Sequence, residues 1–204
     1  MRRNDKEEQI DLLVRLGGIL IVGEVKCFLA PVEPMERFNY LSRLEEAGLQ
    51  AVRKAAWVTA NPEVVADHLG LSPEDAKKLR PIPIVVLNQG TGFGLLAGGA
   101  RIIDFHFLSL YLTDGEYHAG AAFNFAEKRG ASQYHSLYGN EREAEENFES
   151  IMARPPTLDR FLSSAIWQKT KFPMSNGEDL EIAICNFNDT NNSDAKDLIS
   201  SVSF

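Results

Sequence analysis

Two apolar runs separated by a pair of glycines stand out near the start of the chain. Residues 9–28 read QIDLLVRLGGILIVGEVKCF. A Gly17–Gly18 pair between apolar runs is typical of a two-residue hairpin turn of type I′, which needs a positive φ at both central positions. The second run, Ile19–Leu29, is nearly all apolar, which indicates a strand buried on both faces with Cys27 inside it. We therefore expect a hairpin at the centre of the fold.

The charged residues of this hairpin are the main functional signal in the sequence. With the two glycines in the turn, counting outward along both strands puts Asp11 opposite Glu24, and Lys26 shares the face of Glu24. Opposed side chains have Cβ atoms about 4.5–5.5 Å apart, so the two carboxylates would repel each other. A divalent cation between Asp11 and Glu24, with Lys26 at the rim, would compensate the buried charge. The alternative is an ordinary cross-strand ion pair on a solvated hairpin, which the apolar flanks disfavour.

A long amphipathic helix is predicted to follow, from Met35 to Trp57, with Pro34 in its first turn. Apolar residues at three- and four-residue steps are expected to cover the sheet, whereas polar and basic residues face elsewhere and could meet a phosphate backbone. The apolar set is Phe38, Leu41, Leu44, Val52 and Ala56, and the polar set is Arg37, Arg43, Gln50, Arg53 and Lys54.

The next segments predict short helices, a strand and a glycine-rich loop. Residues 61–80 indicate two short helices with Asn61 and Ser72 as N-caps. Residues 82–87, IPIVVL, indicate a central strand parallel to the second strand of the hairpin. In the loop that follows, the pattern Gly92-x-Gly94-x-x-Ala97 formally resembles a dinucleotide-binding turn, so nucleotide binding by this loop is an alternative function.

The second half of the chain mixes helical and extended patterns. Its predicted elements are a strand or a strand turning into a helix over residues 101–112, a strand over 116–125, a loop over 128–140, helices over 141–152 and 157–167, and a hairpin over 168–187 around residues 175–177. We expect residues 1–100 to form the core, 101–190 an α+β extension and 191–204 a mobile tail.

Composition narrows the class of protein only a little. The chain has 204 residues and a net charge of −8, so no extended basic surface indicates nucleic acid, although a local basic stripe could still hold phosphates. Its two cysteines give no disulfide framework and favour a cytoplasmic setting. No apolar run is long enough to span a bilayer, so we expect no membrane contact.

The order IDLL, Gly-Gly, GEVK resembles the metal site of the PD-(D/E)xK nucleases, the restriction-endonuclease-like superfamily. The resemblance covers about residues 9–88 and implies an α/β fold with a mixed central sheet flanked by helices. It implies that Asp11 and Glu24 hold Mg²⁺, with Mn²⁺ as a substitute, assisted by the backbone carbonyl of Val25. It also implies that Lys26 orients the attacking water, and it extends less specifically to Gln50 as a polar residue near the site.

The resemblance implies a metal-dependent endonuclease that hydrolyses phosphodiester bonds in DNA. Family members usually carry a helix and a strand before the Asp-bearing strand, whereas here Asp11 follows only ten residues. We therefore expect either a fragment of a larger parent protein or a missing edge supplied by a later segment or by a homodimer partner. The alternative is a catalytically inactive module of the same fold, used for protein or nucleic-acid interaction in a defence or repair protein.

Overall fold

The computed structural model of the protein describes residues 8–124, 129–156, 158, 165–173 and 179–187. The chain divides into two compact units. The first comprises Met1–Tyr117 and Ser136–Ala153, and the second comprises His118–His135 and Arg154–Phe204. The predicted turn at residues 175–177 and the predicted tail at 191–204 lie outside the described residues.

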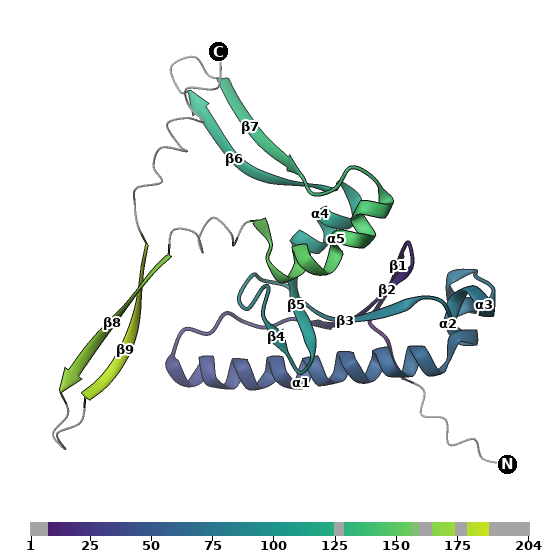
Figure 1. Ribbon diagram of the computed structural model, residues 1–204, viewed down its shortest axis with the longest axis horizontal. Helices are drawn as coiled ribbons and strands as arrows, with labels where there is room; N and C mark the ends of the chain where they lie inside the picture. Colours follow the sequence, from purple (N-terminus) through teal and green to yellow (C-terminus); the bar gives the residue numbers. More distant parts are fainter. Residues whose placement is uncertain (1–7, 125–128, 157, 159–164, 174–178, 188–204) are drawn as a thin grey trace. The chain divides into compact units, whose positions relative to one another are not determined.

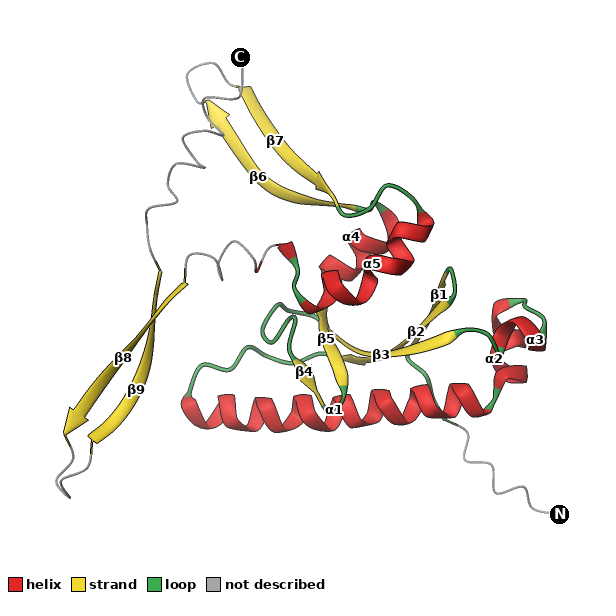
Figure 2. Ribbon diagram, viewed as in Figure 1, coloured by secondary structure: helices red, strands yellow, loops and turns green. Residues whose placement is uncertain are grey.

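The first unit is a mixed five-stranded sheet with helices on both faces (Figures 1 and 2). Its strand order is β1-β2-β3-β5-β4, in which β2, β3 and β5 run parallel and the outer strands β1 and β4 run antiparallel to their neighbours. The strands are β1 (Leu12–Leu16), β2 (Ile19–Lys26), β3 (Arg80–Leu87), β4 (Leu96–Ala97) and β5 (Ala100–Asp104). The helices are α1 (Pro34–Ala60), α2 (Pro62–Leu69), α3 (Pro73–Ala76), α4 (Phe105–Thr113) and α5 (Glu141–Ala153). The predicted mixed α/β class with a helix-flanked mixed sheet is confirmed.

Alternate residues of the central strands are buried against different helices. Ile21 and Ile84 belong to a cluster completed by α4 and α5, including Phe148. Val22 packs with the end of α1 and with α2 and α3, and Val85 packs with the first half of α1. Both faces of β2 and β3 are therefore covered, as the unbroken apolar run of each strand predicts.

The glycine hairpin is present, with a turn that differs from the predicted type. Leu16 pairs with Ile19 and Leu12 pairs with Gly23, which is the predicted register. Gly17 has a φ of 58°, whereas Gly18 does not have a positive φ. The type I′ assignment is therefore wrong, because that turn needs positive φ at both residues.

The strand that follows the turn is shorter than the apolar run predicts. Strand β2 ends at Lys26, Cys27 is exposed, and Leu29 is 91% exposed. The backbone of Phe28 leaves the ladder and bonds to side chains instead: its N–H donates to Asn88 Oδ1, and Gln89 Nε2 donates to its carbonyl. The prediction of a buried strand continuing through Cys27 to Leu29 is wrong for this reason.

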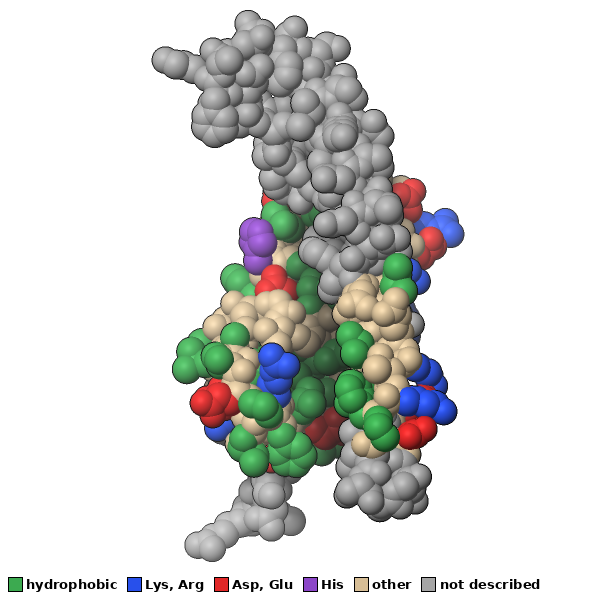
Figure 3. Space-filling model, turned by 90° about the vertical axis from the view of Figure 1, so that its left-hand side faces the viewer, with side chains coloured by type: hydrophobic (Ala, Val, Ile, Leu, Met, Phe, Trp, Pro, Cys, Tyr) green, Lys and Arg blue, Asp and Glu red, His purple; other side chains and the backbone are tan. Residues whose placement is uncertain are grey.

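Helix α1 is present as predicted, but it turns a different face to the sheet. Phe38 and Leu41 are more than half exposed, and Val52 and Ala56 are exposed as well, so of the predicted covering set only Leu44 is buried. The actual contact face combines two large residues near the start of the helix with small residues further along it; its members include Tyr40, Leu44, Ala47, Gly48, Ala51, Ala55 and Val58. Exposed hydrophobic side chains near the start of α1 are Leu29, Val32, Met35, Phe38 and Leu41, and Figure 3 shows hydrophobic side chains gathered at the surface.

The short helices and the strand β3 follow the predictions, with one change at Asn61. The hydroxyl of Ser72 accepts a hydrogen bond from the Asp75 N–H and caps α3 as expected. Asn61 precedes α2, but its side chain donates to the Trp57 carbonyl and so closes the end of α1 instead.

The second half of the chain contains more strand than predicted. Residues 101–112 are a strand turning into the helix α4, one of the two forms expected. Strand β7 (Arg129–Ser136) lies where a loop was predicted and pairs with β6 (Glu116–Asn124). Strand β8 (Ala165–Pro173) includes Trp167, which was predicted to end a helix, and it pairs with β9 (Asp179–Phe187) as the expected hairpin. Most of the predicted helix over 157–167 lies outside the described residues.

In the part of the chain that the structure describes, no helix has the length and apolar character needed to cross a lipid bilayer.

Candidate functional site

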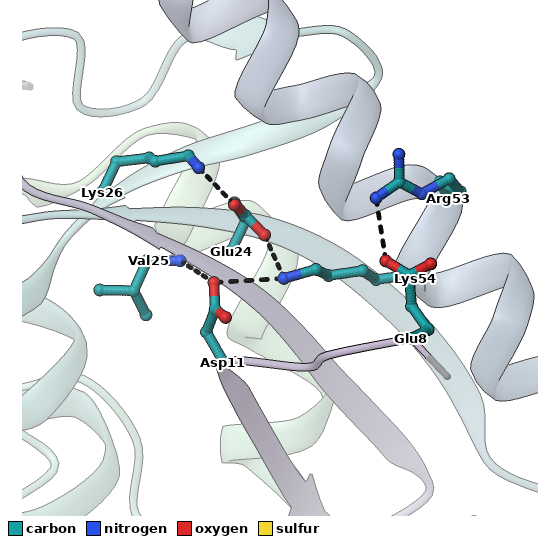
Figure 4. Close-up of polar contacts among 7 residues, drawn as sticks. All are labelled: Glu8, Asp11, Glu24, Val25, Lys26, Arg53 and Lys54. Carbon is teal, nitrogen blue, oxygen red and sulfur yellow. Dashed lines mark hydrogen bonds and ion pairs between the residues drawn. The ribbon is translucent and has the colours of Figure 1, made fainter. Parts of the chain in front are cut away.

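Four charged side chains converge where the β1–β2 hairpin meets α1 (Figure 4). Asp11 lies directly before β1, Glu24 and Lys26 lie on β2, and Lys54 lies on α1. Lys26 Nζ is 2.5 Å from Glu24 Oε1, and Lys54 Nζ is 3.2 Å from Asp11 Oδ2 and also forms an ion pair with Glu24 Oε2. The three residues predicted from the hairpin therefore lie together, joined by a lysine that the prediction placed elsewhere.

Glu24 is buried because of its strand. Strand β2 has a neighbour on each side, and Glu24 is in register with Val85 of β3. The residue is only 4% exposed. A carboxylate removed from water is costly unless it is paired, and here each of its two oxygens faces a different lysine ammonium.

Asp11 is held at the open end of the hairpin by the backbone of the facing strand. Its Oδ2 accepts a hydrogen bond of 3.1 Å from the Val25 N–H. Partial burial raises the pKa of the Asp11 carboxyl, but the Val25 N–H and the Lys54 ammonium outweigh that effect, so the pKa lies below its ordinary value. Asp11 is therefore ionised at neutral pH.

Lys54 is the site residue that the sequence prediction missed. It was assigned to an outward face, yet it is only 5% exposed. A signal was present in the helix sequence: Ala51, Ala55 and Val58 recur at four- and three-residue steps and line the buried face, and Lys54 lies three residues after Ala51 and four before Val58. A lysine within such a stripe of small apolar residues is expected to point toward the sheet only if carboxylates on the sheet can pair with its ammonium.

The other predicted site residues take different positions. Gln50 lies one helical turn before Lys54 and is half-buried, but among the described residues it does not hydrogen-bond to Asp11 or Glu24. Val25 contacts the site through its N–H, whereas its side chain is exposed. The carbonyl role of Val25 and the water-positioning role of Gln50 stay predictions.

A second ion pair lies beside the cluster. Arg53, next to Lys54 on α1, donates from Nη2 to Glu8 Oε1 at 2.9 Å (Figure 4). The Glu8 side chain is mostly buried, with 16% exposed. This contact ties the chain segment before Asp11 to the helix that carries Lys54.

A cleft lies between the loop that follows β2 and the first part of α1. Its volume is about 610 Å³, and it is lined by the loop from Cys27 to Val32 together with α1 residues that include Tyr40 and Arg43. Arg43 precedes Lys54 by eleven residues, which is close to three helical turns, so the two cations lie on the same side of the helix. The cleft begins at Cys27, the residue after Lys26, so it lies next to the end of β2 that carries part of the cluster.

The donor chemistry of the cluster fits Mg²⁺ in part. In the described part of the chain, no group of three His, Cys, Asp or Glu side chains is placed to hold a metal ion. Mg²⁺ is commonly held by only one or two protein carboxylates, with water and substrate phosphate oxygens completing the shell, so Asp11 and Glu24 are a suitable pair. Both carboxylates already contact Lys54.

The glycine-rich loop lacks the geometry of a dinucleotide site. Gly92 and Gly94 have positive φ values of 89° and 84°. They are followed by the short strand β4 and not by a helix, so no helix N-terminus faces a bound phosphate there.

Comparison of the chain with protein-family models, with curated proteins and with solved structures finds no match.

Proposed function

We propose that this protein is a metal-dependent nuclease with a restriction-endonuclease-like core, acting on phosphodiester bonds of DNA. The observation that supports the proposal is the convergence of Asp11, Glu24 and Lys26 at one end of the central strands. Two carboxylates on adjacent chain segments and a lysine two residues after the second one form the arrangement that the resemblance implies. The parallel β2–α1–β3 crossover gives Glu24 its buried position.

Each side chain has a separate task in this proposal. Asp11 and Glu24 would hold Mg²⁺ or Mn²⁺ through their carboxylate oxygens. When bound, such an ion lowers the pKa of a coordinated water and neutralises charge on the scissile phosphate. Lys26 is 30% exposed at the rim, where its ammonium can orient the attacking water or stabilise developing negative charge. Gln50 would position water or substrate from α1.

The acidic net charge of the chain requires the phosphate contacts to be local. Arg43 lines the cleft beside α1, and the exposed face of the same helix carries Arg37. Cations of this kind bind the nucleic-acid backbone without reading its sequence. We infer that the DNA strand follows α1 toward Lys26.

The cleavage test compares the wild type with Glu24→Ala and Lys26→Ala on plasmid and on short single-stranded DNA, with Mg²⁺ or Mn²⁺. We expect cleavage by the wild type and a rate at least about a hundredfold lower in both variants, because each loses a group that acts on the reacting phosphate. Lys77→Ala is the matched control, since Lys77 is exposed and, among the described residues, forms its ion pair with Glu74. Circular dichroism checks that every variant is folded.

An inactive interaction module is the second candidate, and Lys54 favours it. Its ammonium balances the carboxylates without a metal, so the fold can keep the cluster for structural reasons alone. Absence of cleavage together with absence of Mn²⁺ binding by the wild type would assign the protein to this class.

A further inference from the structure

Lys54 lies where the proposed metal ion would have to bind. Its Nζ is 3.2 Å from Asp11 Oδ2 and forms an ion pair with Glu24 Oε2, so one ammonium contacts both carboxylates (Figure 4). We propose that Lys54 is an internal cation that holds the two carboxylates together in the metal-free protein and competes with a divalent ion for them. This inference rests on the proposed metal-dependent function.

Lys54 compensates the enclosed oxygen of Glu24, whereas Lys26 contacts the other oxygen. The side chains of Lys54 and Glu24 are 7% and 5% exposed. Glu24 Oε2 is fully enclosed and has no well-formed hydrogen bond among the described residues, so the ion pair with Lys54 is what balances its charge. A cation is therefore required at this position, and Lys54 supplies it from α1.

The charge of the cluster shows why a divalent ion and Lys54 would exclude each other. Asp11 and Glu24 contribute two negative charges, and Lys26 and Lys54 contribute two positive charges, so the cluster is formally neutral. A bound divalent ion beside Lys54 would add two positive charges at short range in a poorly hydrated site. The long flexible stem of a lysine allows its ammonium to withdraw while the helix stays in place.

Lys26 is not expected to compete in the same way. It contacts Oε1, the other oxygen of Glu24, and its side chain is 30% exposed. Its ammonium can remain hydrated at the rim when the space between Asp11 and Glu24 is filled. The two lysines of the cluster therefore have different roles, although both pair with Glu24.

Titration with Mn²⁺ tests this inference by a readout that does not depend on cleavage. The affinity of the full chain for Mn²⁺ is measured by calorimetry for the wild type, Lys54→Met and Arg53→Met. Arg53→Met is the matched control, because it removes one cation from the same turn of α1 but its ion-pair partner is Glu8. We expect Lys54→Met to bind Mn²⁺ about tenfold more tightly or better, and Arg53→Met to change the affinity much less, because Arg53 forms its ion pair with Glu8 and not with the two carboxylates.

Thermal unfolding gives a second readout. Without metal, Lys54→Met leaves the facing carboxylates poorly compensated, so saturating Mn²⁺ should raise its unfolding temperature more than that of the wild type. If Lys54→Met does not fold, Lys54→Gln replaces it, because the amide keeps most of the side-chain volume without the charge.

The outcomes separate this inference from the proposed function. If the wild type binds Mn²⁺ and both Lys54 variants bind it equally or more weakly, Lys54 does not compete with the metal ion. The proposed metal site at Asp11 and Glu24 would be kept in that case. If Mn²⁺ binds only to the Lys54 variants, Lys54 does compete with the metal ion. The wild-type protein would then not be a metal-dependent nuclease. If no variant binds Mn²⁺, both ideas fail.

Discussion

Tyr111 is a buried titratable residue that stabilises the fold away from the charged cluster. It is fully buried between the sheet and α5, and its hydroxyl donates a 2.6 Å hydrogen bond to the Ala144 carbonyl. The hydroxyl of Tyr138 in turn donates to the Tyr111 carbonyl. Burial raises the pKa of Tyr111 well above its ordinary value, and the nearby Tyr138 adds to the shift.

The raised pKa predicts a loss of stability in alkaline solution. Above about pH 10 the unfolded chain can ionise Tyr111 whereas the folded chain cannot, so the free energy of unfolding should fall as pH rises from that point. Tyr111→Phe should lose about 1 kcal/mol at neutral pH with its hydrogen bond, yet decline less steeply above pH 10. Urea unfolding from about pH 8 to 11 measures both effects.

The exposed Tyr134 provides the control for the alkaline experiment, since Tyr134→Phe also removes one phenol. Equal alkaline slopes for the wild type and Tyr111→Phe would show that Tyr111 is not the group responsible.

At the same scale, the sequence predicted the two carboxylates of the site and Lys26, but not Lys54, which contacts both carboxylates. The positions of Asp11 and Glu24 follow from counting outward from a glycine turn, and the observed register agrees. The burial of Lys54 depends on how α1 is rotated against the sheet. That rotation is set by tertiary packing, which an individual helix sequence encodes weakly.

At the scale of elements, α1 lies unusually close to the sheet edge at Gly48. A Cβ built on Gly48 would lie 1.8 Å from the Ala97 carbonyl oxygen. Glu45, one turn earlier, accepts a 2.8 Å hydrogen bond from the Gly98 N–H. The turn between β4 and β5 therefore rests directly on the helix backbone, and this contact fixes the rotation of α1 that buries Lys54.

This close approach reverses the usual effect of replacing a helical glycine. Gly→Ala inside a helix ordinarily stabilises it by about 1 kcal/mol. Here we expect Gly48→Ala to destabilise the protein by about 1–3 kcal/mol, because the methyl group meets backbone atoms that must shift. Chemical unfolding measures the change, and the exposed neighbour variant Leu49→Ala should be nearly neutral. Stabilisation by Gly48→Ala would mean that the helix does not approach β4 so closely.

The elements themselves were predictable where the hydrophobic period was strong. The hairpin, α1, β3 and α5 have clear patterns, and all four are present. The covering face of α1 was missed because its contact residues include several alanines and a glycine, so the stripe that contains Ala51 and Ala55 carries a weaker hydrophobic signal than the exposed Phe38 and Leu41. Strand β7 has a polar, glycine-containing sequence, RGASQYHS, that resembles a loop, and its strand form depends on pairing with β6.

At the scale of the whole molecule, the hydrophobic core that the structure describes lies in the first unit. Among the residues that the structure describes, the three clusters of buried side chains draw their members from residues 10–117 and 137–152. In the second unit, β8 and β9 form a two-stranded sheet, and an isolated sheet of that kind is marginally stable in water.

Removal of the C-terminal strands should therefore leave the first unit folded. A chain ending at Arg154 keeps every member of the three clusters, and its thermal unfolding midpoint should lie within a few degrees of that of the full chain. Differential scanning calorimetry of the two chains makes the comparison. A shortened chain without a cooperative transition would show that residues 155–204 contribute to the core.

The parallel crossover from β2 through α1 to β3 also sets the order in which the site can form. The hairpin that carries Asp11 and Glu24 closes a two-residue loop and can form within microseconds. Lys54 lies thirty residues after Glu24 in the chain, and the partner strand β3 follows later still. During synthesis the two carboxylates and Lys26 therefore leave the ribosome well before Lys54, the cation that contacts both carboxylates. We therefore expect Glu24 to become buried only when α1 packs on the sheet, so that the charged cluster forms together with the complete sheet.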